Sequence, residues 1–113
     1  MKKIVAIIRP DGLGRVCAVL EKAGYPGVTV SNVEGHGTQK GFRERKVRGT
    51  THRVPFVEKK KIELIVKDSQ AAGIIRAISE AARTGEVGDG KIFISPMDDV
   101  IRIRTGESGE TAI

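Results

Sequence analysis

Cysteine and histidine are scarce in this sequence: of 113 residues, one is cysteine and two are histidine. The single cysteine, Cys17, has no partner for an internal disulfide, which fits a reducing compartment such as the cytosol. One cysteine and two separated histidines, His36 and His52, are also too few for a zinc site. Because Cys17 falls on an apolar helical stripe, we expect it in the core rather than in a catalytic role.

Long apolar runs and catalytic groupings are missing as well. A membrane-spanning helix needs about 18 consecutive apolar residues, and no stretch approaches that length. The start, MKKIVAIIRPDG, has a short apolar run that Arg9 and Pro10 end, without a small-residue cleavage site, so it predicts a strand rather than a signal peptide. No Ser/His/Asp grouping with a nucleophile elbow occurs, and no carboxylates pair around a plausible cleft. We therefore expect a cytoplasmic protein that is neither an enzyme nor inserted in a membrane.

Positive charge, in contrast, is abundant and concentrated. The chain has 20 Lys and Arg against 14 Asp and Glu, a formal net charge of +6. From His36 to Lys61, nine basic residues stand against only Glu44 and Glu58, while the remainder carries 11 basic and 12 acidic residues. One segment therefore supplies the whole excess, which indicates a role for it in binding.

Apolar periodicity predicts four strands and two helices. Strands are expected at 3–9, at 28–33, at 62–66, and in a final region formed by KIFIS and VIRIR, interrupted near Pro96. A helical stripe follows the first strand, with Asp11 as N-cap and Gly24 just past its end. A second stripe lies between 71 and 82, capped by Asp68 or Ser69. The stripes are formed by Leu13, Val16, Cys17 and Leu20, and by Ala71, Ile74, Ile75, Ile78 and Ala82.

The order of these elements is βαββαβ, with a long excursion between the second and third strands. Two helices on one face of an antiparallel four-stranded sheet form the ferredoxin-like α+β arrangement, here as one domain of residues 1–113. The excursion, GHGTQKGFRERKVRGTTHRVPF, is polar and has no sustained period. A polar segment of roughly 20 residues in a small domain is either functional or disordered. We expect it to become ordered only against another molecule.

The stretch RTGEVGDGKIF places three glycines within six residues and a lysine after the last one. Glycine-rich turns beside a cation hold phosphate, because N–H groups and a positive charge converge on an anion. The stretch is not a Walker loop, since Lys91 is followed by Ile92 and a strand. The alternative is an ordinary helix-to-strand turn capped by Gly85. A second glycine-rich stretch, GHGTQKG, fails the dinucleotide spacing but can still bring backbone close to an anion.

An arginine pair near the end of the chain also suggests anion recognition. Arg102 and Arg104 alternate with isoleucines, which predicts two guanidinium groups on one face of a strand or its extension, suited to a polyanion. A solvated strand face is the alternative. Glu63, within KKKIELIV, is expected at an exposed position of a strand, with ligand contact as the less favoured interpretation.

The basic excursion also raises the hypothesis of a small nucleic-acid-binding protein. Against it, only Phe42 and Phe56 are aromatic in that segment, and no RNA-binding sheet motif is present. We therefore do not expect nucleic acid as the partner.

Taken in order, these pieces resemble the PII signal-transduction proteins, small trimeric sensors of nitrogen and carbon status. The resemblance covers essentially the whole chain through MKKIVAIIRP, GVTVSNVEGHG, QKG, RTGEVGDGKIFI and VIRIRTGE, and is most specific from Thr84 to Ile94. It implies a homotrimer that regulates nitrogen assimilation. It also implies three functional loops: a T-loop at about 37–55, a B-loop at about 84–91 and a C-loop at about 102–106.

The resemblance further implies ATP and ADP in clefts between adjacent subunits, with 2-oxoglutarate and Mg²⁺ as co-effectors. Gln39 would complete the Mg²⁺ shell together with ATP phosphates and 2-oxoglutarate. The implied nucleotide-binding residues are Thr29, Gly37, Thr38, Glu63, Ile65, Gly88, Asp89, Gly90, Lys91, Arg102 and Arg104. The implied 2-oxoglutarate-binding residues are Gln39, Lys40, Gly41 and Lys59.

For partners, the resemblance makes the T-loop an effector arm that docks on target proteins. Arg48 corresponds to the arginine that enters the cytoplasmic pore of an ammonium transporter, which would recruit the protein to the membrane. A nitrogen-metabolism enzyme such as glutamine synthetase is the second expected partner. The alternative within the same fold is a PII-like adenylate-binding sensor of a different metabolite or pathway.

Three positions depart from the family pattern. Thr38 stands where the family often has an arginine that contacts phosphate, and the T-loop is one residue longer between Arg43 and Val47. His52 occupies the place of the loop tyrosine that many members carry as a nucleotidylation site. Thr50 stands where some cyanobacterial members carry a phosphorylated serine, which makes it a weak candidate for phosphorylation. We therefore expect signalling by ligand occupancy alone.

Overall fold

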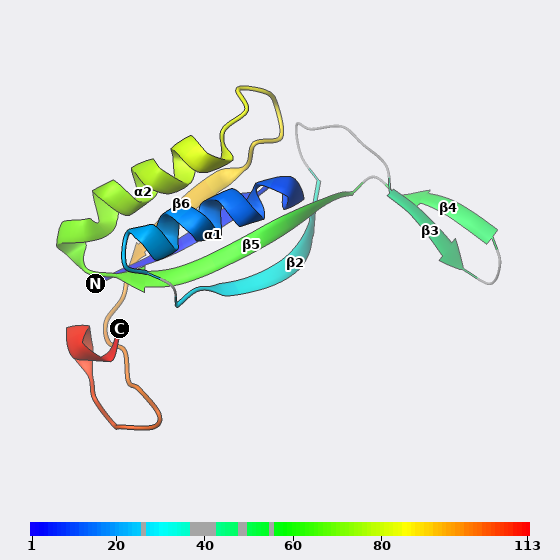
Figure 1. Ribbon diagram of the computed structural model, residues 1–113. Helices are drawn as coiled ribbons and strands as arrows, with labels where there is room; N and C mark the ends of the chain where they lie inside the picture. The colour runs from blue at the N-terminus through cyan, green and yellow to red at the C-terminus, as the bar shows by residue number, and fades with distance from the viewer. Residues whose placement is uncertain (26, 37–42, 48–49, 55) are drawn as a thin grey trace.

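A four-stranded antiparallel sheet with the strand order β2-β5-β1-β6 forms the centre of the computed structural model. The structure describes residues 1–25, 27–36, 43–47, 50–54 and 56–113. The strands are β1 (Lys2–Ile8), β2 (Thr29–Gly35), β5 (Val57–Val66) and β6 (Lys91–Pro96), with helices α1 (Leu13–Lys22) and α2 (Asp68–Ala82) on one face (Figure 1). The predicted ferredoxin-like βαββαβ fold is therefore confirmed.

The core lies between this sheet and the two helices. Every second residue of β1 is buried, namely Ile4, Ala6 and Ile8, which is the alternation of a strand with one covered face. On the helices, the buried residues follow the predicted stripes, with Val16 and Leu20 on α1 and Ala71, Ile74, Ile78 and Ala82 on α2. Cys17 is only half-buried and is absent from this cluster, so the expectation of a core cysteine was wrong.

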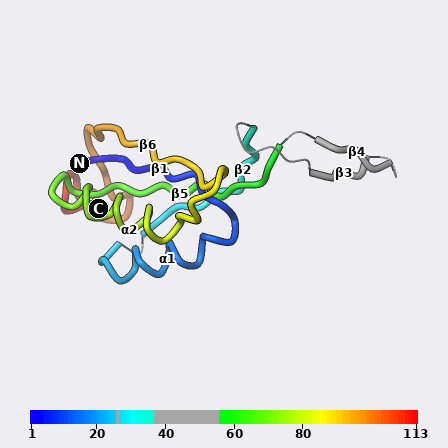
Figure 2. The backbone as a smooth tube through the Cα atoms, turned by 90° about the horizontal axis from the view of Figure 1, so that it is seen from above, coloured from blue at the N-terminus to red at the C-terminus, as the bar shows by residue number. Residues whose placement is uncertain are grey.

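The opposite face of the sheet has no covering layer within the described part of the chain, as Figure 2 shows from above. The side chains that share this face include Val5 and Phe93, which are cross-strand partners. Phe93 is 54% exposed. A large apolar side chain left in water on a sheet face indicates a surface that another layer covers.

The basic excursion contains regular structure, contrary to the expectation of a segment that orders only against another molecule. Its backbone forms a hairpin of β3 (Arg43–Val47) and β4 (Thr50–Val54), which extends away from the main sheet in Figures 1 and 2. At its base, Gly35 pairs with Val57, and the rings of His36 and Phe56 lie 5.7 Å apart. The two ends of the excursion are thus held next to each other by strand pairing and by a ring contact.

Two predictions of local structure were wrong for identifiable reasons. Asp11 does not cap α1, because residues Pro10–Gly12 form a 3₁₀ turn (η1) and Gly12 is the N-cap. Asp68 is the first helical residue of α2 and Lys67 is its N-cap, without a side-chain capping bond, so neither Asp68 nor Ser69 caps the helix. Gly24 follows α1 with a φ of 88°, as the C′ position requires.

The predicted strand at VIRIR was also wrong. After β6 ends at Pro96, the only further strand pairing of the described chain is a single bridge between Ile101 and Ser108, and the chain turns between these two residues. A short 3₁₀ helix, η2 (Gly109–Ala112), closes this C-terminal arm. Neither helix of the described chain is long and apolar enough to cross a membrane.

Candidate functional site

The glycine loop, defined here as residues 84–90, connects α2 to β6. Gly85, Gly88 and Gly90 have φ values of 90°, 104° and 101°, a region that residues with a side chain rarely adopt. Gly85 is not the helix C′ residue, because α2 ends at Ala82 with Arg83 already extended, so the alternative of a simple capped turn does not hold. A Cβ at Gly90 would lie 1.7 Å from the carbonyl oxygen of Ile7. The loop backbone therefore approaches β1 as closely as glycine permits.

The carboxylate of Asp89 accepts hydrogen bonds from other residues of the same loop. Oδ2 of Asp89 accepts hydrogen bonds from the backbone N–H groups of Thr84 and Gly85, both at 2.8 Å. Oδ1 accepts from the Thr84 hydroxyl and from Nε of Arg9, the latter at 3.1 Å. These donors, the Thr84 hydroxyl first, hold the pKa of Asp89 well below its ordinary range. The carboxylate is thus kept charged and is used to shape the loop.

Two cations support the same loop from the end of the sheet. Nη2 of Arg9 donates to the carbonyl oxygen of Val87 at 2.7 Å, and Nζ of Lys59 donates to the carbonyl oxygen of Gly88. Lys59 is 8% exposed, and burial, followed by the nearby charge of Arg9, lowers the pKa of its amine, while Asp89 partly offsets this. The amine predicted to bind 2-oxoglutarate thus already contacts the glycine loop, which is predicted to bind nucleotide.

Next to the loop lies a hollow of about 370 Å³, within the usual size range of ligand sites. It is lined by the glycine loop, by β1, β5 and β6, and by the residues that enter the basic excursion. Its lining residues are Ile7, Gly35, His36, Val57, Lys59, Glu86, Gly88, Asp89, Gly90, Lys91 and Phe93. Four predicted nucleotide residues (88–91) and one predicted 2-oxoglutarate residue (59) therefore share one cavity.

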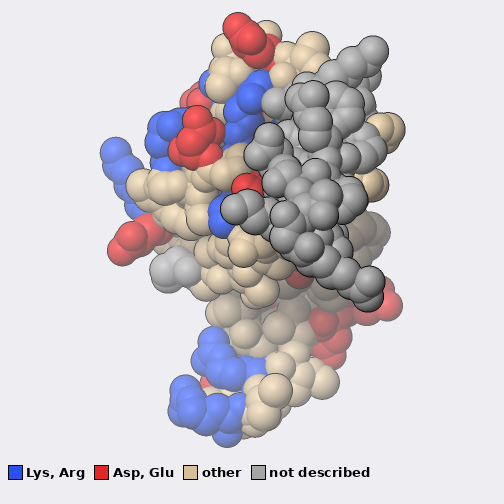
Figure 3. All heavy atoms as spheres, turned by 90° about the vertical axis from the view of Figure 1, so that its right-hand side faces the viewer, with Lys and Arg blue, Asp and Glu red and all other residues tan. Residues whose placement is uncertain are grey.

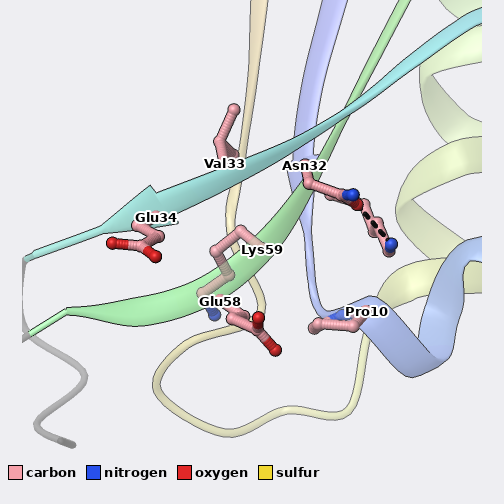
Figure 4. Close-up of a pocket in the computed structure, with 7 residues that line it drawn as sticks. Pro10, Asn32, Val33, Glu34, Glu58 and Lys59 are labelled. Carbon is pink, nitrogen blue, oxygen red and sulfur yellow. Dashed lines mark hydrogen bonds between the residues drawn. The ribbon is translucent and has the colours of Figure 1, made fainter. Parts of the chain in front are cut away.

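A second hollow, of about 420 Å³, opens on the helix side of the β2–β5 edge (Figure 4). Glu34 and Glu58, which are directly opposite each other in the strand register, both line it. Lys60 also lines it and donates to the side chain of Asn32, the dashed contact in the figure. Each of the two hollows is lined by two cations and two carboxylates: Lys59 and Lys60 with Glu34 and Glu58 here, and Lys59 and Lys91 with Glu86 and Asp89 beside the loop. What favours the glycine-loop cavity for an anion is the backbone of Gly88 and Gly90 that lines it.

Three predicted nucleotide-binding residues, Thr29, Glu63 and Ile65, lie on the uncovered sheet face, but not beside Lys91. Thr29 and Glu63 are cross-strand partners on β2 and β5. Glu63 pairs with Lys61 at 2.9 Å, and the hydrogen bond from that lysine is the main reason why the pKa of Glu63 is lowered. Because β2 and β6 are the two edges of the sheet, Thr29 is three strand spacings, roughly 14 Å, from the strand that carries Lys91. Ile65 shares this face, two residues beyond Glu63.

Arg102 and Arg104 lie at the other end of the molecule. The glycine loop precedes β6 and the C-terminal arm follows it, so the two are separated by the length of that strand, roughly 17 Å for its six residues (Figure 1). In Figure 3, basic side chains on the arm at the bottom are separated by uncharged atoms from the charged residues above. Arg102 contacts Oε1 of Glu107 at 3.5 Å and the main-chain oxygen of Ile113 at 3.3 Å. A single chain therefore does not bring the two arginines to the loop.

Several predicted residues lie outside what the structure describes: Gly37, Thr38, Gln39, Lys40, Gly41 and Arg48. They include the proposed Mg²⁺ ligand, and within the described residues no group of three or more His, Cys, Asp and Glu could hold a metal ion. Of Thr50, only its place in the backbone of β4 is described.

Sequence reasoning missed Arg9 and Thr84, which bind Asp89 from opposite directions. Arg9 is 80 residues from Asp89 in the chain, so no local pattern could pair them. The one available signal was the position of Arg9 directly before Pro10, at the end of a strand that was predicted correctly. Thr84 lay within the recognised glycine stretch, but its hydroxyl was given no role.

The comparisons with known proteins agree with this arrangement. The family described as nitrogen regulatory protein P-II matches residues 1–107. Proteins named nitrogen regulatory protein P-II from Nostoc punctiforme and Synechocystis are each 53% identical over all 113 residues and over their own full length. Nitrogen regulatory protein P-II 2 of Methanothermobacter thermautotrophicus is 50% identical over the whole chain and 97% of its own.

The fold has a solved counterpart in Arabidopsis thaliana PII bound to citrate. It is 46% identical, with a TM-score of 0.81, over 99% of this chain and 91% of that one. The relatives are named as regulatory proteins, which confirms that the chain is a regulator rather than an enzyme. By family match, identity and fold, this chain belongs to the PII nitrogen-regulatory proteins.

Proposed function

We propose that this PII protein senses ATP and ADP at the glycine loop and transmits nucleotide occupancy to target proteins. The observation that carries the proposal is the cavity beside the loop. Gly88, Gly90 and Lys91 line it with close-approaching backbone and a cation, which is the chemistry of a phosphate site. These residues fit the phosphates of a nucleotide, and membership of the PII family supports an adenine nucleotide.

We further propose that each site is shared between two copies within a homotrimer. Arg102 and Arg104 lie at the far end of β6 from the loop, so a second copy is needed to bring them to the phosphates. The uncovered sheet face, with Phe93 54% exposed, is a surface that copies of this chain would bury against one another. A trimeric mass by light scattering at micromolar concentration is the first check.

Calorimetry with two variants and their mixture tests both proposals. Lys91→Gln and Arg104→Ala should each weaken ATP and ADP binding roughly tenfold to a hundredfold, because each removes a charge-assisted contact. When the two variants are unfolded together and refolded as mixed trimers, sites with the loop of one variant and the arm of the other regain both cations. Recovery of a tight-binding fraction supports the shared site. If mixing recovers nothing although both single variants bind weakly, the site lies within one chain.

We propose that 2-oxoglutarate binds next to the nucleotide and only with Mg-ATP, through Lys59 and residues 39–41. Lys59 lines the cavity, and its amine has three donors, so it can hold Gly88 and a ligand carboxylate together. When bound, the metal would supply a bridge between phosphate and keto-acid oxygens. Lys59→Ala should weaken 2-oxoglutarate more than ADP. Equal affinity for the keto-acid without nucleotide would contradict the scheme.

A sensor of another carboxylate is the second candidate, favoured by the citrate-bound Arabidopsis relative. Calorimetry with citrate in place of 2-oxoglutarate, each with and without Mg-ATP, separates the two. Saturable binding of citrate in the absence of any response to 2-oxoglutarate would favour the alternative.

For the output, we propose that the hairpin of β3 and β4 docks on a target, with an ammonium transporter first and glutamine synthetase second. The segment from 36 to 61 holds the chain's whole charge excess, and its hairpin stands away from the domain (Figure 1). Docking would bring a cytoplasmic protein to the membrane. A pull-down with and without 2-oxoglutarate should capture the target with the wild type and lose it on deletion of residues 42–53. Retention of every partner by the deletion variant would exclude the hairpin as the effector arm.

We also propose that no nucleotide is attached to the hairpin, because His52 stands in place of the tyrosine hydroxyl. Thr50 remains a weak candidate for phosphorylation, which would add about −1.5 to −2 charge to a basic segment. Intact-mass spectrometry of native protein from nitrogen-starved and nitrogen-replete cells should show no nucleotide-monophosphate adduct. Such an adduct in either condition would contradict the proposal.

A further inference from the structure

The supports of the glycine loop form one connected network that reaches three separate elements. Asp89 belongs to the loop, Arg9 follows β1, and Lys59 belongs to β5. Arg9 contacts both the Asp89 carboxylate and the Val87 carbonyl, so it links the side-chain closure of the loop to its backbone. The side chains of Arg9 and Asp89 are each only 23% exposed. This network is partly shielded from water and is not a loose surface ion pair.

The contacts of the two cations determine how the loop presents its N–H groups. A trans peptide is planar, and its C=O and N–H groups point in opposite directions. The chain has no cis peptide bonds among its described residues. Because the Val87 carbonyl accepts from Arg9, the N–H group of Gly88 points away from Arg9, and because the Gly88 carbonyl accepts from Lys59, the N–H group of Asp89 points away from Lys59. Successive backbone N–H groups that converge on one point form an anion-binding concavity.

The hydrogen-bonding capacity of the Asp89 carboxylate is already occupied by groups of the protein. It accepts from two backbone N–H groups, one hydroxyl and one guanidinium, so both oxygens already have two donors each. A carboxylate also repels phosphate. Its side chain is therefore unsuited to contact a nucleotide, although the sequence prediction counted Asp89 among the nucleotide-binding residues.

We propose that Arg9, Thr84 and Asp89 are positioning residues that hold the glycine loop in its phosphate-binding form before the nucleotide arrives. None of the three side chains touches the phosphates; they act through the orientation of the Gly88 and Asp89 amides. The inference rests on the proposed nucleotide function. It attributes part of the affinity for nucleotide to residues that do not contact the nucleotide. Lys59 joins the network but also serves the proposed keto-acid site, so it is left out of the test.

The test combines ATP and ADP calorimetry with amide hydrogen exchange at Thr84 and Gly85. Asp89→Asn removes the negative charge and replaces one of the two accepting oxygens by a donor, and Arg9→Gln removes the guanidinium. Both should weaken nucleotide binding roughly tenfold to a hundredfold, the effect of losing charge-assisted hydrogen bonds. Both should also speed exchange at Thr84 and Gly85 in the nucleotide-free protein. Asp98→Asn and Arg76→Gln, which make the same charge changes at exposed positions on other elements, should change neither quantity.

A second pair of variants keeps the test decisive if the charge changes disturb folding. Thr84 is exposed, and its hydroxyl donates to Asp89 and accepts from the Glu86 N–H at 3.2 Å. Thr84→Val removes the hydroxyl at nearly constant shape, whereas Thr84→Ser keeps it. Nucleotide affinity should fall with valine and be retained with serine.

Each outcome has a defined meaning. Weaker binding by Asp89→Asn with unchanged exchange would mean that the carboxylate contacts the ligand directly, which overturns the inference. Equal affinities of the valine and serine variants would overturn it as well. If Lys91→Gln and Arg104→Ala weaken binding while Arg9→Gln and Asp89→Asn do not, the proposed function stands and the positioning role fails. If the wild type binds no adenine nucleotide, the proposed function itself fails.

Discussion

The glycine loop and the C-terminal turn, defined here as residues 102–107, both have cations near glycines of positive φ, yet different contacts hold them in place. In the loop, Arg9, which follows β1, and Lys59 of β5 hold a backbone that touches β1, and Asp89 accepts from two of the loop's own amides. In the turn, backbone bonds from Arg102 N to Glu107 O, at 2.9 Å, and from Gly106 N to Arg102 O, at 2.8 Å, close the chain on itself. The loop is therefore part of the domain, whereas the turn is a local structure on an arm.

This difference separates what each region can contribute to ligand binding. The loop's backbone is fixed before any ligand arrives, so it can supply oriented amides at little further entropic cost. The turn supplies charged side chains, and Arg102 already shares its charge with Glu107. Because the two regions lie at opposite ends of β6, a complete site in the proposed homotrimer would combine the loop of one copy with the side chains of another. The comparison predicts that damage to the loop lowers the stability of the fold strongly, whereas changes at the turn change stability little.

The largest effect should come from Gly90→Ala. Its Cβ would lie 1.7 Å from the carbonyl oxygen and 2.8 Å from the carbonyl carbon of Ile7, at a φ of 101°. Backbone cannot move aside, so strain and overpacking together should lower the free energy of unfolding by about 3 kcal/mol or more. Chemical denaturation measures this loss.

Gly85→Ala is the matched control for that prediction. Gly85 has a similar φ of 90°, but no atom lies within 4 Å of an added Cβ. Only the conformational cost of about 1–2 kcal/mol should therefore appear. Equal losses for the two variants would show that the contact with β1 is unimportant.

The next prediction uses pH to isolate Asp89. Its pKa is lower in the folded protein than the ordinary value of 3.8, chiefly because of the hydrogen bond from the Thr84 hydroxyl. Such a carboxyl stabilises the fold fully above its unfolded pKa and loses that contribution as the pH falls toward the folded pKa. The stability difference between wild type and Asp89→Asn should thus stay constant from about pH 8 to 5 and shrink below about 3.8. Denaturation across that range measures it, with Asp98→Asn as the control, and a difference that already shrinks near neutral pH would point to a different titrating group.

Much of the fold was predictable because burial is periodic. The stripes on both helices, apart from Cys17, and the first strand were predicted from the sequence and are confirmed. The strand β5 was predicted only from Ile62, although it begins at Val57, because VEKKK is charged and carries no apolar alternation; Lys59 is buried out of phase with Ile62, Leu64 and Val66. The segment VIRIR has the alternation of a strand, but no neighbouring strand of the described chain pairs with it. The chain instead reverses direction at a turn that contains Gly106.

The site was predictable only where its residues are contiguous. Residues 88–91 were recognised from one stretch, and the structure places them in one cavity with Lys59. Arg9 could not be paired with Asp89, because their contact depends on β1 and β6 being neighbours in the sheet. The separation of Arg104 from the loop is likewise a property of strand length and order, which sequence motifs do not encode.

The smallest effect should come from Glu107→Gln, in the C-terminal turn. The Arg102–Glu107 pair is 3.5 Å long, with side chains 38% and 42% exposed, so its loss should change stability by less than about 1 kcal/mol. In the proposed shared site, the Glu107 carboxylate competes with phosphate for Arg102. Its removal should therefore raise ATP affinity by about twofold to threefold, an energy within the range of exposed ion pairs. Calorimetry measures this, with Glu110→Gln as a control for charge on the same arm. If affinity falls instead, Glu107 orients Arg102 much as Asp89 organises its loop, and the contrast between a preformed loop and an adaptable turn would not hold.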